Sequence, residues 1–137
     1  PMTLEEIPEA ECLALLAGRS VGRLVVVADD GPLALPVNYV VDGRTVAVRT
    51  AAGTTLDSAT LGKVAFEVDH IDEEHRAGWS VLVRGVGRDV TEGVDAWSER
   101  LRAHALEPWA AGDRSHWVAI ASPRITGRRI RGPGGPG

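Results

Sequence analysis

The sequence is poor in cysteine and lysine, has no long apolar run and carries no excess of positive charge. A single cysteine, Cys12, excludes an internal disulfide and fits a reducing compartment, for which we expect the cytoplasm. No apolar run approaches the roughly 18 residues of a membrane span, and no secretory leader precedes the first predicted helix. The formal net charge of −4 argues against a nucleic-acid partner, because phosphates require a basic surface.

The length of 137 residues, with 44% hydrophobic and 25% charged residues, is typical of one globular domain. We place this domain at residues 2–130. Residues 131–137 are mostly glycine and proline, which predicts a flexible tail.

Valine-rich runs separated by turn residues dominate the chain after residue 20. They predict about six strands and two or three short helices without βαβ alternation, which favours an antiparallel barrel over a doubly wound sheet. The turn Asp42-Gly43 joins the clearest hairpin, and Pro123 predicts an edge position or a bend in the last strand. We expect strands at residues 21–28, 33–41, 44–50, 64–71, 79–90 and 116–130, and helices at 8–17, 56–61 and 94–105. A second copy would cover apolar barrel surface that slim helices cannot cover, so we expect a homodimer.

Several familiar catalytic patterns are incomplete in this sequence. Ser115 and His116 are neighbours, but no nucleophile elbow or acidic partner accompanies them, which disfavours a serine hydrolase. The acidic run at 69–75 matches no metal-ligand spacing, and we expect no metal site. Glu67 and Asp69 alternate on one face of a strand, which we interpret as a solvent or interface face.

The segment at residues 48–55 leaves a strand and enters a predicted helix. It offers one guanidinium, three hydroxyls and backbone N–H groups, from Arg49, Thr50, Gly53, Thr54 and Thr55. Such a set of donors suits a phosphate group. The alternative interpretation is a polar loop in which Thr54 or Thr55 caps the helix.

Four segments follow one another in a fixed order: LPVNYVVDGRTVAVRTAAGTT, VAFEVD, GWSVLVRG, and HWVAI with the later GRRI. In order and spacing they resemble the nitroimidazole-reductase-like branch of the pyridoxamine 5′-phosphate oxidase-like family. The resemblance extends from the first helix to Ile130. It implies a mainly β (α+β) fold, a split β-barrel homodimer that binds FMN in a groove at the subunit interface.

The resemblance also implies positions for the cofactor. The flavin ring lies against the strand formed by Pro36, Val37, Asn38 and Tyr39. The phosphate lies on the strand end and loop formed by Val48, Arg49, Thr50, Gly53, Thr54 and Thr55. Trp79 and Ser80 open the strand that approaches the reactive edge of the ring, and Trp109 walls the site from the other subunit. No residue is identified as catalytic.

The side-chain chemistry agrees with these positions. Pro36 lacks an N–H and fits an interrupted strand ladder, Asn38 can donate to a flavin carbonyl, and tryptophan rings exclude water. Thr55 stands where relatives often carry a basic residue, so Arg49 must supply more of the positive charge. The cofactor is therefore left open between FMN, a deazaflavin and haem, and a chain without cofactor is a further alternative.

Two functions follow from the resemblance. The first is an FMN-dependent oxidoreductase that passes electrons from a reduced nicotinamide to a small electrophile such as a nitro compound, a quinone or oxygen. The second is a non-catalytic carrier or sensor of flavin, deazaflavin or haem, for which the candidate iron ligands are His70, His75, His104 and His116. Oxidation of pyridoxamine phosphate itself is disfavoured, because the sequence shows no second basic cluster for a substrate phosphate.

Overall fold

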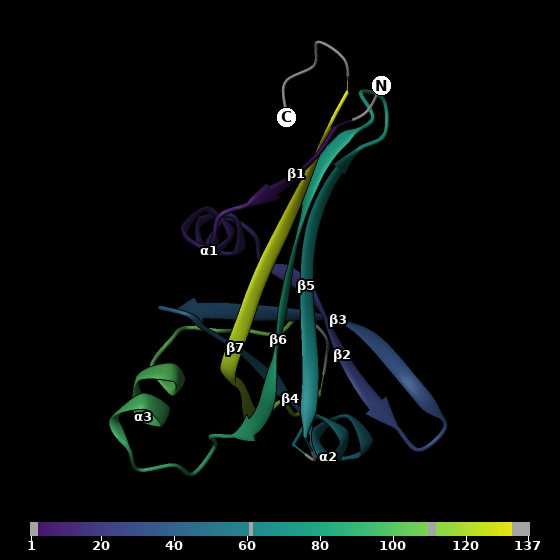
Figure 1. Cartoon of the computed structure of the whole chain (residues 1–137). Coiled ribbons are helices and arrows are strands. Elements are labelled where there is room, and N and C mark those ends of the chain that lie inside the picture. Colours follow the sequence, from purple (N-terminus) through teal and green to yellow (C-terminus); the bar gives the residue numbers. More distant parts are fainter. Residues whose placement is uncertain (1–2, 61, 110–111, 133–137) are drawn as a thin grey trace.

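The computed structural model describes residues 3–60, 62–109 and 112–132, which form seven strands and three short helices (Figure 1). The strands are β1 (Thr3–Ile7), β2 (Val21–Ala28), β3 (Gly31–Asp42), β4 (Thr45–Thr50), β5 (Lys63–Asp72), β6 (Ala77–Asp89) and β7 (His116–Arg131). The helices are α1 (Glu9–Ala17), α2 (Thr54–Thr60) and α3 (Ala96–Arg102). Within this part of the chain no helix has the length and apolar character to cross a membrane. The predicted tail falls largely at residues 133–137, outside the described residues.

All seven strands join in one antiparallel sheet in the order β1-β7-β4-β3-β2-β5-β6. β6 also pairs with β7 over most of its length, so the sheet closes into a barrel. Figure 1 shows β5, β6 and β7 continuing beyond the closed part as a long extension, with α1 beside it. The predicted split β-barrel is confirmed, with one strand more than expected.

The hairpin that Asp42-Gly43 predicts is present between β3 and β4. Asp42 pairs with Thr45 across a two-residue turn, and Gly43 has a φ of 59°. A residue with a side chain rarely adopts this backbone conformation, whereas glycine does so at little cost. The turn therefore fixes the register of β4 against β3, and with it the position of Arg49 and Thr50 at the end of β4.

The bend predicted at Pro123 is confirmed. The pairing of β6 with β7 shifts register between Arg84 and Val86, and Ser122 has a φ of 50°. Around Pro123 the strand pairs with β6 alone, because β4 pairs only up to Ala119 and β1 begins to pair at Gly127. A proline without an N–H fits this gap in the ladder.

Both faces of β4 are buried. Val46 and Val48 belong to the hydrophobic core inside the barrel. Ala47 belongs to a second cluster, in which Leu101 of α3 is fully buried. Because side chains alternate along a strand, this two-sided burial holds β4 rigidly between the two clusters.

Two differences from the predicted elements have identifiable causes. β1 is not predicted, since four of its five residues are exposed and show no alternation, yet it pairs with the end of β7. α3 begins two residues later than predicted, because the Asp95 carboxylate caps it by accepting from the Ser98 N–H at 3.0 Å.

Candidate functional site

A cavity of about 430 Å³ opens beside the start of β2, the middle of β3 and the end of β4. Seven of the predicted site residues line it: Pro36, Val37, Asn38, Arg49, Thr50, Thr55 and Trp109. The lining further includes Val21, Leu35, Pro108 and Arg114, which the sequence analysis does not single out. The cavity thus combines apolar surface with two guanidinium groups and two hydroxyls.

Arg49 holds the chain segment that closes the cavity. Its Nε donates to the carbonyl of Arg114 at 2.9 Å and its Nη1 donates to the carbonyl of Leu106 at 2.7 Å. The guanidinium carbon also lies 5.6 Å from the centre of the Trp117 ring. Two of its five N–H donors are thus engaged, and the other three have no partner among the described residues.

Asn38 holds the same segment at Trp109, between the two residues that Arg49 contacts. Its Oδ1 accepts from the backbone N–H of Trp109 at 2.8 Å, and its Nδ2 donates to the carbonyl of Ser20 at 3.1 Å. The indole of Trp109 is 76% exposed and forms part of the wall in its own chain. Asn38 therefore positions the backbone of Trp109. This role is additional to the predicted hydrogen bond from Asn38 to a flavin carbonyl.

Arg114 is the residue that sequence reasoning missed. It lines the cavity and supplies a second guanidinium, while Thr55 occupies the position where the resemblance places a basic residue in relatives. No carboxylate among the described residues forms an ion pair with Arg114, whereas five other arginines have such a partner. No local sequence pattern links Arg114 to Arg49, because 65 positions separate them. The only signal in the sequence is that Arg114 follows a glycine-containing loop.

Six predicted residues do not line this cavity: Tyr39, Val48, Gly53, Thr54, Trp79 and Ser80. Tyr39 lies in the barrel core, where its hydroxyl donates to the carbonyl of Leu16 and burial raises its pKa to about 12. Trp79 packs against the same core, with the guanidinium carbon of Arg19 6.0 Å from the ring centre. The roles of Trp79 and Ser80 beside a flavin ring remain predictions.

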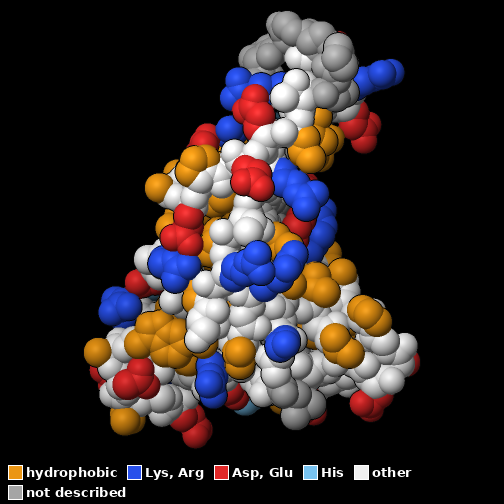
Figure 2. Space-filling model, viewed as in Figure 1, with side chains coloured by type: hydrophobic (Ala, Val, Ile, Leu, Met, Phe, Trp, Pro, Cys, Tyr) orange, Lys and Arg blue, Asp and Glu red, His pale blue; other side chains and the backbone are white. Residues whose placement is uncertain are grey.

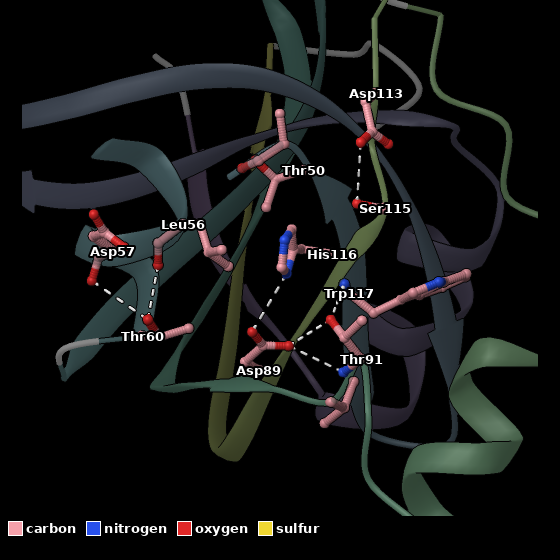
Figure 3. Close-up of polar contacts among 12 residues, drawn as sticks. Thr50, Leu56, Asp57, Thr60, Asp89, Thr91, Asp113, Ser115, His116 and Trp117 are labelled. Atoms are coloured by element: carbon pink, nitrogen blue, oxygen red, sulfur yellow. Dashed lines mark hydrogen bonds and ion pairs between the residues drawn. The ribbon is translucent and has the colours of Figure 1, made fainter. Parts of the chain in front are cut away.

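A polar network lies next to Thr50 on the neighbouring strand. Figure 3 shows His116, the cross-strand partner of Thr50, with its ring between Thr50 and Asp89. Its Nδ1 lies 3.6 Å from Asp89 Oδ2, so the fold supplies the acidic partner that the sequence analysis did not find. Although burial opposes the effect, hydrogen bonds from Thr91 lower the pKa of Asp89.

This network does not amount to a hydrolase site. Ser115 Oγ lies 3.4 Å from Asp113 Oδ2 and forms no hydrogen bond with His116 among the described residues. Within that same part of the chain no group of three or more histidine, cysteine or acidic side chains is placed to hold a metal ion.

Glu67→Gln is expected to raise the melting temperature at pH 8 and to leave it unchanged near pH 4.5. Burial, and then the neighbouring carboxylate of Asp69, raise the pKa of Glu67 from about 4.5 to about 7. A group with a raised pKa stabilises the fold below its unfolded pKa, and this contribution is lost as the pH rises through the folded pKa. Arg23, whose Nη1 lies 3.7 Å from Glu67 Oε1, offsets only part of the loss.

Thermal unfolding between pH 4.5 and pH 8 measures this effect. The matched control is Glu92→Gln, since Glu92 is exposed and forms no ion pair among the described residues. An equal shift at both pH values would contradict the explanation.

Comparison with known proteins adds four findings. The family model described as pyridoxamine 5′-phosphate oxidase matches residues 8–129. The solved FAD binding protein from Mycobacterium smegmatis is 35% identical, with a TM-score of 0.69 over 94% of this chain and 100% of that chain. An uncharacterized protein of Mycobacterium tuberculosis is 35% identical over 91% of this chain and 84% of its own length. The heme binding protein from Mycobacterium smegmatis is 17% identical, with a TM-score of 0.65 over 83% of this chain and 51% of that chain, a likeness of fold alone.

Proposed function

This chain belongs to the pyridoxamine 5′-phosphate oxidase family, and from that premise we propose that its cavity binds a flavin nucleotide. The observation that carries the proposal is the set of groups within one cavity. Arg49 and Arg114 can bind a phosphate, with hydroxyls from two threonines beside them. Pro36 and Trp109 offer flat apolar surface for an aromatic ring system.

We propose further that the protein is a cytoplasmic oxidoreductase that passes electrons from a reduced nicotinamide to a small electrophile. The described lining of the cavity contains no carboxylate, histidine or cysteine. A bound flavin supplies the redox chemistry that these side chains lack. The chain's own residues bind the cofactor, orient it and exclude water, and Asn38 does so by holding Trp109 in place.

FMN is the flavin that the sequence resemblance implies, whereas the M. smegmatis relative binds FAD. The first experiment is therefore a visible absorption spectrum of the purified protein, followed by titration with FMN, FAD, a deazaflavin and haem. We expect a flavin spectrum or saturable binding of FMN or FAD. We further expect that reduction by NADH or NADPH and reoxidation by a nitro compound or quinone proceed faster than with free flavin.

The other outcomes of this experiment separate the alternatives. Flavin binding without faster electron transfer would replace the oxidoreductase by a carrier or sensor. Binding of haem alone would favour the second candidate, which rests on the fold shared with the heme binding protein. If none of the four cofactors bound, the cavity would have another use.

We also propose that two copies pair through the outer face of β2, β5 and β6. A shallow apolar hollow of about 410 Å³ lies there, lined by Val25, Val27, Ala65 and Val86, and Val27 is 68% exposed. Contiguous exposed apolar surface of this kind is often an interaction site. Sedimentation velocity is expected to show a dimer that Val27→Asp converts to a monomer, and a monomeric wild-type chain would overturn the proposal.

A further inference from the structure

Three arginines lie together on the outer face of β6 and β7. Arg84 and Arg124 are direct cross-strand partners, and Arg128 lies four residues farther along β7, so its side chain leaves the same face. They line a groove of about 430 Å³ together with Glu6 and Thr126. Figure 2 shows basic side chains gathered over the middle of the molecule, where β5, β6 and β7 run side by side in Figure 1.

None of these three arginines forms an ion pair with a described residue. Elsewhere on the described surface five arginines do so: Arg23, Arg44, Arg100, Arg129 and Arg131. Glu6 is the cross-strand partner of Arg128, yet their charged groups are too far apart for an ion pair. Like charges directly opposite each other destabilise a strand pair. An uncompensated Arg84–Arg124 pair in a chain of net charge −4 therefore indicates an external counter-ion.

We propose that this groove binds a phosphate group of a small molecule. Three arginines and one glutamate give the lining a net charge of +2, which matches the −1.5 to −2 of a phosphomonoester at about pH 7. Guanidinium groups bind phosphate oxygens in pairs, and the hydroxyl of Thr126 adds a short donor. The groove shares no lining residue with the cavity proposed for the flavin, so the inference does not depend on flavin binding.

The sequence could not reveal this cluster, because Arg84 and Arg124 are forty positions apart. Only the register of β6 against β7 places them opposite each other. No second basic cluster is visible in the sequence, because these arginines come together only through the pairing of β6 with β7. The phosphate has two possible sources: the 2′-phosphate of a nicotinamide dinucleotide, or inorganic phosphate and small phosphorylated molecules.

The test compares thermal unfolding of the full chain in sodium phosphate and in sodium chloride of equal ionic strength. We expect phosphate to raise the melting temperature of the wild type. In Arg124→Gln the phosphate concentration for half the effect should rise about tenfold or more, because a charged hydrogen bond is lost. The matched control is Arg88→Gln, an exposed arginine four residues from Arg84 on the same strand and outside the groove lining.

A second arm distinguishes the sources. If the wild type binds NADPH more tightly than NADH and Arg124→Gln loses that preference, the phosphate is that of the dinucleotide. If phosphate stabilises the protein without such a preference, the ligand is inorganic phosphate or a phosphorylated small molecule. Equal stabilisation by phosphate and chloride, or an equal phosphate effect in the wild type and Arg124→Gln, would overturn the proposal.

Two further measurements keep the test independent of folding and assembly. Without phosphate, Arg124→Gln should unfold at the same or a higher temperature than the wild type, since it relieves repulsion from Arg84. Arg84 also borders the apolar hollow through which we propose dimerisation, whereas Arg124 and Arg128 do not. Arg128→Gln therefore serves as the second variant, and we expect it to weaken the phosphate effect as Arg124→Gln does. If Arg128→Gln left the phosphate effect unchanged, phosphate would not bind in this groove.

Discussion

Arg49→Ala is expected to weaken flavin binding by about tenfold to a hundredfold, because a charged hydrogen bond contributes about 1.5–3 kcal/mol. Two effects combine in this variant. The cavity loses one of its two guanidinium groups. The carbonyls of Leu106 and Arg114 also lose their donors, which frees the segment that carries Trp109. Equilibrium titration followed by flavin absorbance, together with tryptophan fluorescence of the free protein, measures both effects.

Two companion variants separate charge from positioning. Arg114→Ala removes the second charge but leaves both carbonyl contacts of Arg49 in place, since they involve the backbone. We expect it to weaken flavin binding without changing the fluorescence of the free protein. Arg49→Lys keeps the charge but cannot reproduce the fork that reaches two carbonyls. If neither Arg49→Ala nor Arg114→Ala weakens flavin binding, the phosphate does not lie between them.

Gly87→Ala is expected to destabilise the fold by about 3 kcal/mol or more, the upper range for overfilling a packed interior. A Cβ at this position would lie 1.6 Å from the carbonyl oxygen of Ala59 and 2.7 Å from its carbon. Both are backbone atoms of α2, so the helix or β6 must move as a whole. Because Thr55 of α2 lines the cavity, weaker flavin binding should accompany the loss of stability.

Urea unfolding, with the free energy of unfolding extrapolated to water, measures this loss. Gly62→Ala is the matched control, since a Cβ there meets no atom within 4 Å and its φ lies outside the left-handed region. The Gly87 N–H donates to the Gly62 carbonyl at 3.1 Å, so the two glycines are neighbours in the same corner of the barrel. Equal free energies of unfolding for the two variants would show that α2 moves away from position 87 without loss of stability.

Local patterns predicted the strands well where burial alternates along them. In β5 the even-numbered residues from Val64 to Val68 are buried and the residues between them face outwards, which is the pattern that the sequence shows. β1 lacks such a pattern. It forms because the end of β7 offers a free edge and Arg131 lies 3.6 Å from Glu5, and a tertiary cause of this kind leaves no trace in five residues.

The residues of the candidate site likewise fall into those that lie close together in the sequence and those that only the fold brings together. Pro36, Asn38, Arg49 and Thr50 lie on or near the hairpin of β3 and β4, and the structure brings these four predicted residues to one cavity. Arg114 and the Arg84–Arg124 pair depend on contacts between distant parts of the chain. The family resemblance made Tyr39 a candidate, yet its side chain lies in the barrel core.

β7 pairs with β1, β4 and β6, and it is the last strand of the sheet along the chain. During synthesis, therefore, β4 and β6 each keep one unpaired edge until residues 116–131 have left the ribosome. Contacts of such long sequence separation form slowly, and unpaired edges attract other chains while they wait. A stop codon before residue 116 would thus release a chain whose sheet is open at β4 and β6, and a slow codon there would prolong that open state on the ribosome.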